Sequence, residues 1–318
     1  MSRYFFNPSE NRLRAGWRIL LFVPLFMLFA SLIFLVRPLL GDVGKKEFLN
    51  DYSLLIVLIL AFAATLAVYL SRRFLDKKSF PSLGLKRTQR TLPDLLFGFF
   101  LSAVMAGMFF GLALLFGLID YHGLNWNPLP AGTDYVSFIS VLSIGSLAIF
   151  LVEHILVGYW EELVFRGYLF QNMREGLGLV LAIVVSCLLY GLIHASNPNA
   201  TVLSSSIIVL FGFLRIYGYL STKMLWFSMG MHIGWNFFQG PIFGFSASGH
   251  QTATLVDLSP TGPDWLSGGA FGPEGSLLII PILGLALLAM RWWSKKGFAF
   301  NRREASLTIL SVESGERP

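Results

Sequence analysis

Long apolar blocks, separated by short polar connections, dominate the pattern of hydrophobic and polar positions along this chain. Blocks of about 18 or more apolar residues are typical of membrane-crossing helices, because lipid offers no hydrogen-bond partner to an unpaired backbone group. The pattern therefore predicts about eight transmembrane helices. They run over roughly Ile19–Val36, Leu54–Leu70, Leu95–Ile119, Val136–Tyr159 with a polar continuation, Leu177–Ala195, Val202–Leu220, Met224–Phe238 and Leu277–Trp293.

Composition indicates that one membrane domain accounts for most of the chain. Of the 318 residues, 55% are hydrophobic and 13% are charged, whereas a soluble domain carries about 25% charged residues. With so little charge, most of the protein surface cannot face water. We expect an all-α, polytopic membrane protein, with a cytoplasmic N-terminal segment at 1–18, a single transmembrane helical domain at 19–293 and a polar cytoplasmic tail at 294–318.

A loop rich in Gly, Ser, Thr and Pro separates the last two apolar blocks. It runs from Gly240 to Gly272 and contains no Lys or Arg. Loops without basic residues are typical of the outer side of a membrane. There the segment is expected either to form a cap or to remain flexible.

The distribution of basic residues predicts the orientation in the membrane. With the N-terminus in the cytoplasm, all of the 24 Lys and Arg residues except Arg37, Lys45 and Lys46 fall on the cytoplasmic side. This count assigns Arg215 and Lys223 to the cytoplasmic end of the sixth block. The positive-inside rule then places both termini in the cytoplasm. The same distribution explains the formal net charge of +6, so no nucleic-acid partner is expected.

Ionisable and amide side chains inside the apolar blocks are concentrated in three places. Charged groups at membrane depth are costly, and by default they indicate a functional site. These groups are Glu161, Glu162 and Arg166 at the end of the fourth block, Tyr190 and His194 at the end of the fifth, and His232 and Asn236 in the seventh.

Helix geometry allows these groups to meet. At about 1.5 Å per residue, Glu161, His194 and His232 fall within a band of about 10 Å in a hydrocarbon core about 30 Å thick. Glu162 and Arg166 are four residues apart, so they share a helix face and can pair. Glu161 is rotated by about 100° from that face and remains available for another partner.

An acid, two imidazoles and a carboxamide suit the hydrolysis of an amide by activated water. A carboxylate and an imidazole can act as a general base and its partner, and an imidazole with a carboxamide can donate to an oxyanion. His232 and Asn236 lie one turn apart on a common face. Glu153 and His154 lie two turns before the first motif and belong to no recognised pattern, so they are not included in the site.

The three motifs together resemble the CPBP intramembrane protease family, which includes the type II CAAX prenyl endopeptidases and the bacterial Abi and bacteriocin-immunity proteins. The resemblance covers a core from about Leu151 to Gly240. The opening segment, Asn11–Arg18, is similar to bacterial members, which implies a bacterial plasma membrane and makes a prenylated CAAX substrate unexpected. Tyr190 departs from the family pattern, which usually has Phe at this position.

The resemblance implies a glutamate-dependent endopeptidase that cleaves a membrane-associated protein or peptide. In this arrangement Glu161 and His194 would hold and deprotonate a water molecule, which attacks the scissile carbonyl. His232 and Asn236 would stabilise the resulting oxyanion.

The resemblance implies less about the pair Glu162–Arg166 and about a metal. Glu162 and Arg166 would brace the site, although they can equally form a structural ion pair. The family was once assigned as metalloproteases, and a bound zinc ion would be held by Glu161, His194 and His232. No His-Glu-x-x-His helix is present, and we expect the chemistry to run without a tightly bound metal.

Two other functions remain open at this point. A non-catalytic scaffold or immunity protein would keep the polar pocket and act by binding partners. An ion-coupled transporter would use the intramembrane Glu and His side chains to relay protons.

The predicted orientation can be tested with reporter fusions. Fusions after Arg18 and after Arg303 are both expected to report the cytoplasm, because each position follows a cluster of basic residues. An outside signal from either fusion would show that the number of membrane crossings is wrong.

Overall fold

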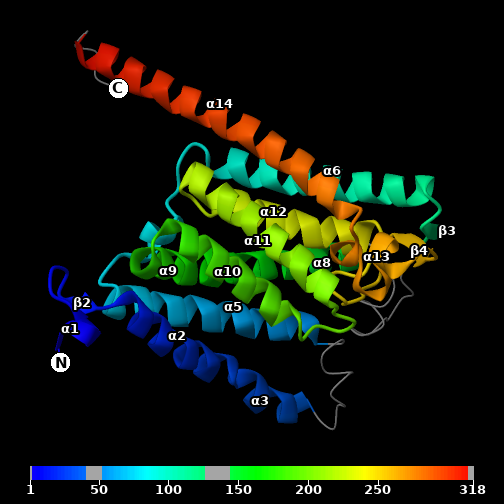
Figure 1. Cartoon of the computed structure of the whole chain (residues 1–318), viewed down its shortest axis with the longest axis horizontal. Coiled ribbons are helices and arrows are strands. Elements are labelled where there is room, and N and C mark those ends of the chain that lie inside the picture. Colours follow the sequence, from blue (N-terminus) through cyan, green and yellow to red (C-terminus); the bar gives the residue numbers. More distant parts are fainter. Residues whose placement is uncertain (1, 41–51, 126–143, 314–318) are drawn as a thin grey trace.

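The computed structural model describes residues 2–40, 52–125 and 144–313, and most of them lie in helices packed side by side (Figure 1). The helices are α1 (Ser2–Phe5), α2 (Ala15–Ala30), α3 (Leu32–Val36), α5 (Ser53–Leu70), α6 (Thr91–Leu115), α8 (Ile144–Glu162), α9 (Phe170–Leu177), α10 (Leu179–His194), α11 (Val202–Thr222), α12 (Trp226–Phe237), α13 (Asp264–Ser267) and α14 (Ile279–Glu313).

Each of the eight apolar blocks corresponds to a helix where it is described, and the crossing of the membrane by all eight stays a prediction. By length and composition, four described helical stretches are candidate spans: Ala15–Leu39, Ser53–Leu75, Thr91–Leu115 and Val202–Thr222. Helix α10 is apolar but shorter, and α12 has only 12 residues, about 18 Å of helix. The start of the fourth block, 136–143, lies outside the described residues.

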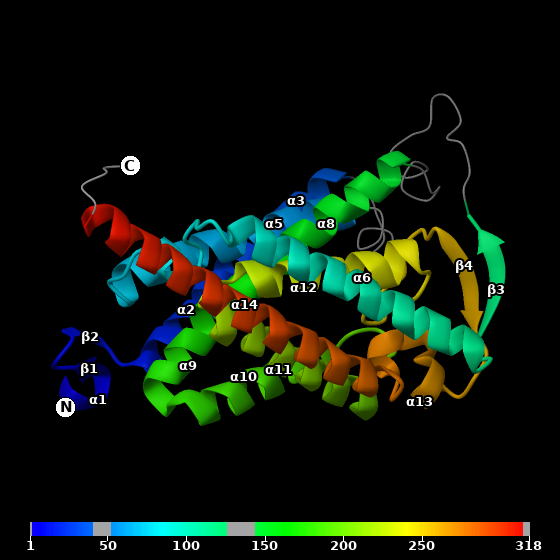
Figure 2. The same cartoon turned by 90° about the horizontal axis from the view of Figure 1, so that it is seen from above.

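The expected helical fold is confirmed for most of the described chain, and short strands that were not predicted pair at both ends of the bundle. Strands β1 (Phe6–Asn7) and β2 (Arg12–Leu13) form a small antiparallel hook before α2. Strands β3 (Ile119–Leu124) and β4 (Val256–Pro260) pair antiparallel at the opposite end, beside α13 (Figures 1 and 2).

The helix of the third apolar block therefore ends before Ile119, which is the first residue of β3. Helix α6 stops at Leu115, and Gly117 adopts a left-handed conformation with φ of 64° that breaks the helix. The partner strand β4 lies within the Gly-rich loop 240–272. Of the two possibilities for that loop, the structure contains a folded cap.

The last helix extends past the boundary expected from the apolar pattern. The block was predicted to end at Trp293, with a polar tail from 294, but α14 continues to Glu313. No Gly or Pro interrupts residues 298–313, so nothing in the backbone chemistry ends the helix there. Helix α14 runs across the bundle towards the end that holds α1 (Figures 1 and 2).

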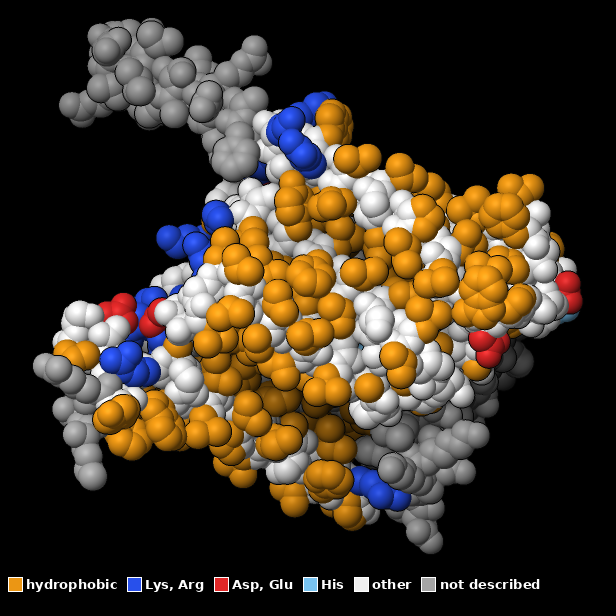
Figure 3. Space-filling model, in the orientation of Figure 1, with side chains coloured by type: hydrophobic (Ala, Val, Ile, Leu, Met, Phe, Trp, Pro, Cys, Tyr) orange, Lys and Arg blue, Asp and Glu red, His pale blue; other side chains and the backbone are white. Residues whose placement is uncertain are grey.

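The sides of the bundle are apolar. Large hydrophobic side chains such as Phe34, Phe62, Val104 and Leu188 are exposed. On the face shown in Figure 3, hydrophobic side chains spread over the middle of the molecule. Lys and Arg side chains gather in that view near the end that holds α1. A surface of this kind is covered by lipid rather than by water, as expected for an integral membrane protein.

Two glycines fix the position of α12 against α6. A Cβ atom added at Gly230 would lie 2.0 Å from the backbone oxygen of Leu95, and one at Gly234 would lie 2.4 Å from that of Phe99. Small residues four apart allow helix backbones to approach this closely. His232 lies between the two glycines in sequence, and at about 100° per residue it faces the opposite side of α12.

Substitution of Gly230 tests this contact. Gly230→Ala is expected to lower the free energy of unfolding by about 1–3 kcal/mol, because the added methyl group collides with the α6 backbone. Gly111→Ala, in α6 with no atom within 4 Å of the added Cβ, should leave stability unchanged or raise it slightly. Equal thermal unfolding shifts for the two purified variants would contradict the assigned contact.

Candidate active site

The first motif lies where α8 gives way to a wider helical turn. Glu161 and Glu162 end α8, and Leu163–Leu169 form a π-helical turn that contains Arg166 and leads into α9. Turns of this kind are rare and frequently occur at functional sites. Helix α9 then stops before Gly178, whose φ of 80° turns the chain into α10.

Glu162 is the buried centre of the ionic contacts. Its side chain is fully buried, and its Oε1 lies 3.1 Å from an Arg166 nitrogen and 3.1 Å from Nδ1 of His232. The Nε atom of Arg215, from α11, lies 4.0 Å from the same oxygen. The pairing of Glu162 with Arg166, predicted from their spacing, is confirmed.

Glu161 faces a different set of partners, as its rotation around the helix requires. Its Oε2 accepts a hydrogen bond from the Tyr190 hydroxyl at 2.9 Å and lies 3.8 Å from Nε2 of His232. The Glu161 side chain is 12% exposed, whereas that of Glu162 is 0% exposed. Of the two adjacent carboxylates, Glu161 is therefore the one that solvent can reach.

His232 bridges the two carboxylates. A carboxylate oxygen only accepts, so the contact with Glu162 places a hydrogen on Nδ1 of His232. Its other ring nitrogen faces Glu161. The 3.8 Å between that nitrogen and Glu161 Oε2 is longer than a hydrogen bond. Both atoms therefore remain available to contact one reacting group.

His194 reaches this cluster through Tyr190. Its ring centroid lies 4.5 Å from that of Tyr190, and its Nδ1 lies 2.8 Å from the Tyr190 carbonyl oxygen. Because a carbonyl oxygen only accepts, Nδ1 carries the hydrogen, and Nε2 of the neutral ring is left as an acceptor. His194 is half-buried and contacts the residue that holds Glu161.

Asn236 lies one turn beyond His232 on α12 and is half-buried. The intervening Trp235 donates from its indole nitrogen to Oε1 of Glu274 at 2.9 Å, and the Ser248 hydroxyl donates to Oε2 of the same carboxylate. Glu274 is buried and follows the Gly-rich loop. The cap is thus attached directly to the helix that holds His232 and Asn236.

Arg215 was misplaced by the sequence analysis. It was assigned to the cytoplasmic end of a helix, but it is buried within α11, donates to the Tyr190 hydroxyl and approaches Glu162. The position lies seven residues before the end of α11 at Thr222, about 10 Å into the helix. Its place inside an apolar block was the signal that could have identified it.

Glu274, a buried acid in the cap, carries no such signal. It precedes the last apolar block in a polar loop, where a carboxylate is normally solvated. No local pattern distinguishes it from a surface residue.

The described residues show no preformed metal site. A zinc site needs three or four ligands that converge on one point, and the residues named for it are Glu161, His194 and His232. Among the described residues, no group of three or more His, Cys, Asp or Glu side chains is placed to hold a metal ion. Tyr190 contacts both His194, through its ring, and Glu161, through its hydroxyl.

One family of known proteins matches part of this chain. Residues 143–238 match the family described as type II CAAX prenyl endopeptidase Rce1-like. The matched segment includes all three motifs, from Glu161 to Asn236. No curated protein matches the chain. The match confirms the resemblance to CAAX-type intramembrane proteases that the motifs indicated.

The contact between Tyr190 and Arg215 can be measured with a double-mutant cycle. Tyr190→Phe is expected to cost about 1–3 kcal/mol of unfolding free energy, because it leaves a buried guanidinium nitrogen without its acceptor. In the Arg215→Leu background the same change should cost at least about 1 kcal/mol less.

Tyr168→Phe provides the matched control, because Tyr168 is a buried tyrosine whose hydroxyl contacts the backbone oxygen of Arg18. Its effect on unfolding should add to that of Arg215→Leu. Additive effects for Tyr190→Phe as well would show that the two residues are not coupled.

Proposed function

We propose that the protein is a glutamate-dependent endopeptidase that cleaves a membrane-associated protein or peptide, because its residues 143–238 match the family described as type II CAAX prenyl endopeptidase Rce1-like. The observation that carries the proposal is the pair Glu161–His232, two groups 3.8 Å apart in the interior of an apolar helix bundle. Placing such groups at membrane depth is costly, so their presence there indicates a functional site.

Water activation is assigned to Glu161. Its carboxylate is partly accessible and is held through Oε2 by Tyr190, which leaves the other oxygen to accept a proton from water. His194, with Nε2 as acceptor, assists from the other side of Tyr190. The hydroxide attacks the scissile carbonyl carbon, and the proton taken up by Glu161 later passes to the departing amine nitrogen as the C–N bond breaks.

Stabilisation of the oxyanion is assigned to His232 and Asn236. The two side chains lie one turn apart on α12, so an imidazole N–H and a carboxamide N–H can reach one oxygen. Such donors, fixed before the reaction begins, contribute most where water is excluded. The close packing of α12 against α6 through Gly230 and Gly234 supports their placement.

Glu162 and Arg166 hold the reacting groups without contacting the substrate. Glu162 orients His232 through Nδ1, in the way that a carboxylate orients a catalytic imidazole in other hydrolases. Arg166 pairs with Glu162 and places its guanidinium carbon 4.2 Å from the centre of the Tyr190 ring. The pair thereby supports both sides of the site.

Replacement of Glu161 tests the proposal. Glu161→Gln keeps the shape and the hydrogen bond from Tyr190 but cannot accept a proton, so cleavage should fall by about 10²- to 10⁴-fold. The measurement is the rate of product formation by purified protein from a library of membrane peptides.

Glu153→Gln is the matched control. Glu153 is a buried acid of the same helix α8, and its replacement should leave cleavage unchanged. Equal loss in both variants would argue against a specific base. A scaffold protein would retain its full binding function with Glu161→Gln, and a transporter would instead lose ion-coupled flux in liposomes.

Removal of metal tests the assignment of water activation to Glu161 and His194 alone. The purified protein is expected to keep its activity after chelation, because the proposed steps use only protein groups. One equivalent of zinc, whose removal abolishes cleavage and whose return restores it, would overturn this expectation. It would then identify Glu161, His194 and His232 as ligands.

A further inference from the structure

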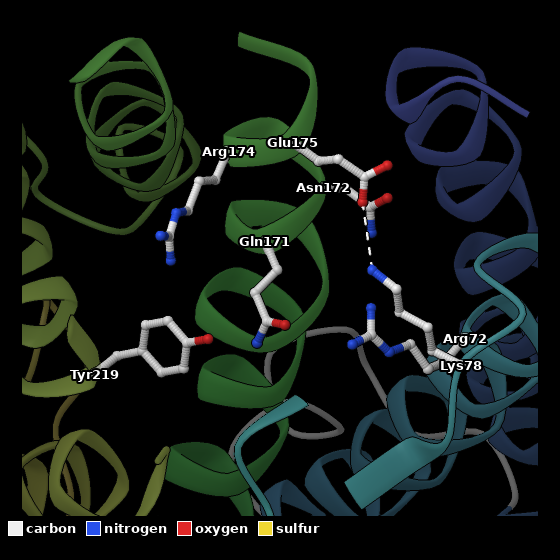
Figure 4. Close-up of a pocket in the computed structure, with 7 residues that line it drawn as sticks. All are labelled: Arg72, Lys78, Gln171, Asn172, Arg174, Glu175 and Tyr219. Atoms are coloured by element: carbon white, nitrogen blue, oxygen red, sulfur yellow. Dashed lines mark ion pairs between the residues drawn. The ribbon is translucent and has the colours of Figure 1, made fainter. Parts of the chain in front are cut away.

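A polar cavity of about 260 Å³ (Figure 4) lies beside the N-terminal hook, whose Arg12 pairs with Glu175 of the cavity, and no motif residue lines it. Three cations, Arg72, Lys78 and Arg174, and one carboxylate, Glu175, are among its lining residues. Figure 4 shows Arg174 on one side of Gln171, with Arg72 and Lys78 on the other. Its volume is below the roughly 300–1,000 Å³ typical of drug-sized ligands, so it suits a small group. Its three cations favour a group with negative charge.

The carboxylates near this cavity are already paired with arginines, one of which, Arg72, also lines it. Glu175 pairs with Arg12 at 2.9 Å and with Arg18. Asp76 is shared between Arg18 and Arg72, each at 2.7 Å.

Lys78 and Arg174 therefore supply positive charge in excess. Lys78 lies 3.6 Å from Glu175, whose charge Arg12 and Arg18 already meet. Arg174 has no carboxylate partner among the described residues. A ligand that matches the cavity must be an anion.

Asn172 supplies a second, independent indication of a ligand. Its side-chain nitrogen donates to the Tyr168 carbonyl oxygen at 3.0 Å, which leaves its Oδ1 as an acceptor. This oxygen is buried without a hydrogen-bond partner in a residue only 1% exposed. Asn172 lines the cavity, so the matching group on a ligand is a donor such as a hydroxyl.

A second, mainly apolar groove of about 540 Å³ shares Asn172 with the first cavity. Its lining includes Trp17, Ile19, Leu20 and Met173. Tryptophan at such a position is typical of the level of the lipid headgroups. The polar cavity and the apolar groove thus meet at one buried amide.

We infer that these two cavities together form a binding site for one anionic phospholipid with a hydroxylated headgroup, of the phosphatidylglycerol type. The phosphate faces Lys78 and Arg174, a headgroup hydroxyl donates to Oδ1 of Asn172, and an acyl chain lies along the groove. The orientation predicted from the basic residues places this end at the cytoplasmic leaflet, which is rich in anionic lipid.

The site is positioned to influence the motif helix. Asn172 and Arg174 belong to α9, which continues directly from the π-helical turn that contains Arg166. A bound lipid would therefore fix the end of the helix that leads to Glu161 and Glu162. The proposal itself concerns binding and does not depend on the protein being a protease.

Native mass spectrometry of the full chain, purified from mixtures of phosphatidylglycerol and phosphatidylcholine, tests the binding. The wild-type protein should retain one phosphatidylglycerol. The Lys78→Ala/Arg174→Ala variant should bind it about 25-fold more weakly, at about fivefold for each cation removed.

The matched control for charge is Lys86→Ala/Arg87→Ala, which removes two exposed cations that follow α5 but line neither cavity. It should bind phosphatidylglycerol like the wild type. Equal losses in the two double variants would overturn the inference in favour of general attraction to an anionic membrane surface.

The acyl-chain part has its own test. Gly16 lines the groove and has no atom within 4 Å of an added Cβ, so Gly16→Leu fills the groove without a collision. It should lower retention of the lipid, whereas Gly111→Leu, on α6 and also without a close neighbour, should not. Unchanged retention in Gly16→Leu would overturn the acyl-chain assignment.

Inorganic phosphate separates a lipid site from a free-anion site. In phosphatidylcholine nanodiscs, phosphate alone should give little increase in the unfolding temperature, and phosphatidylglycerol should give a clear one that is lost in Lys78→Ala/Arg174→Ala. Equal stabilisation by phosphate would show a site for a free anion and would contradict the inference.

Discussion

A carboxylate buried in an apolar bundle must find its counter-charges within the protein, because neither water nor lipid supplies them. Glu162 meets this constraint with Arg166 on the following turn and with His232 on α12. Arg215 on α11 adds a third contact. One carboxylate thus connects the turn after α8 with α11 and α12, which are far apart in sequence. The other distances at the site depend on the relative positions of these segments. The glycine contacts between α12 and α6 maintain the side of this arrangement that contains His232.

The parts of the site that the sequence predicted are those encoded by local spacing. Four residues separate Glu162 from Arg166, and the helical repeat alone brings them together. The approach of His232 to Glu161 at 3.8 Å was consistent with the depth estimate, but depth does not specify which helices are neighbours. The number of spans stays a prediction for a related reason. An apolar block predicts a helix, whereas a crossing also requires length, and α12 is a short helix inside the bundle.

The residues that the sequence did not identify act over long separations. Arg215 contacts Tyr190, and Glu274 contacts Trp235, in both cases through side chains on different elements. The Tyr190 hydroxyl explains why Tyr, and not the family's usual Phe, suits this chain. A buried guanidinium needs an acceptor, and the same hydroxyl donates to Glu161. The strand pairing of the cap was missed because β3 follows an apolar helix with no alternating pattern of its own.

The contacts of His232 also bear on where its protons lie. Its Nδ1 donates to Glu162, so in the neutral ring Nε2 would present a lone pair to Glu161 Oε2, 3.8 Å away. Two electron-rich atoms that face each other in a medium of low polarity repel, and a proton on either one removes the repulsion. With the proton on Nε2, His232 is a cation between two carboxylates, Glu161 remains a base, and the N–H points towards the space between them. In the proposed mechanism, Glu161 accepts a proton from water in this state while His232 donates to the oxygen of the attacked carbonyl.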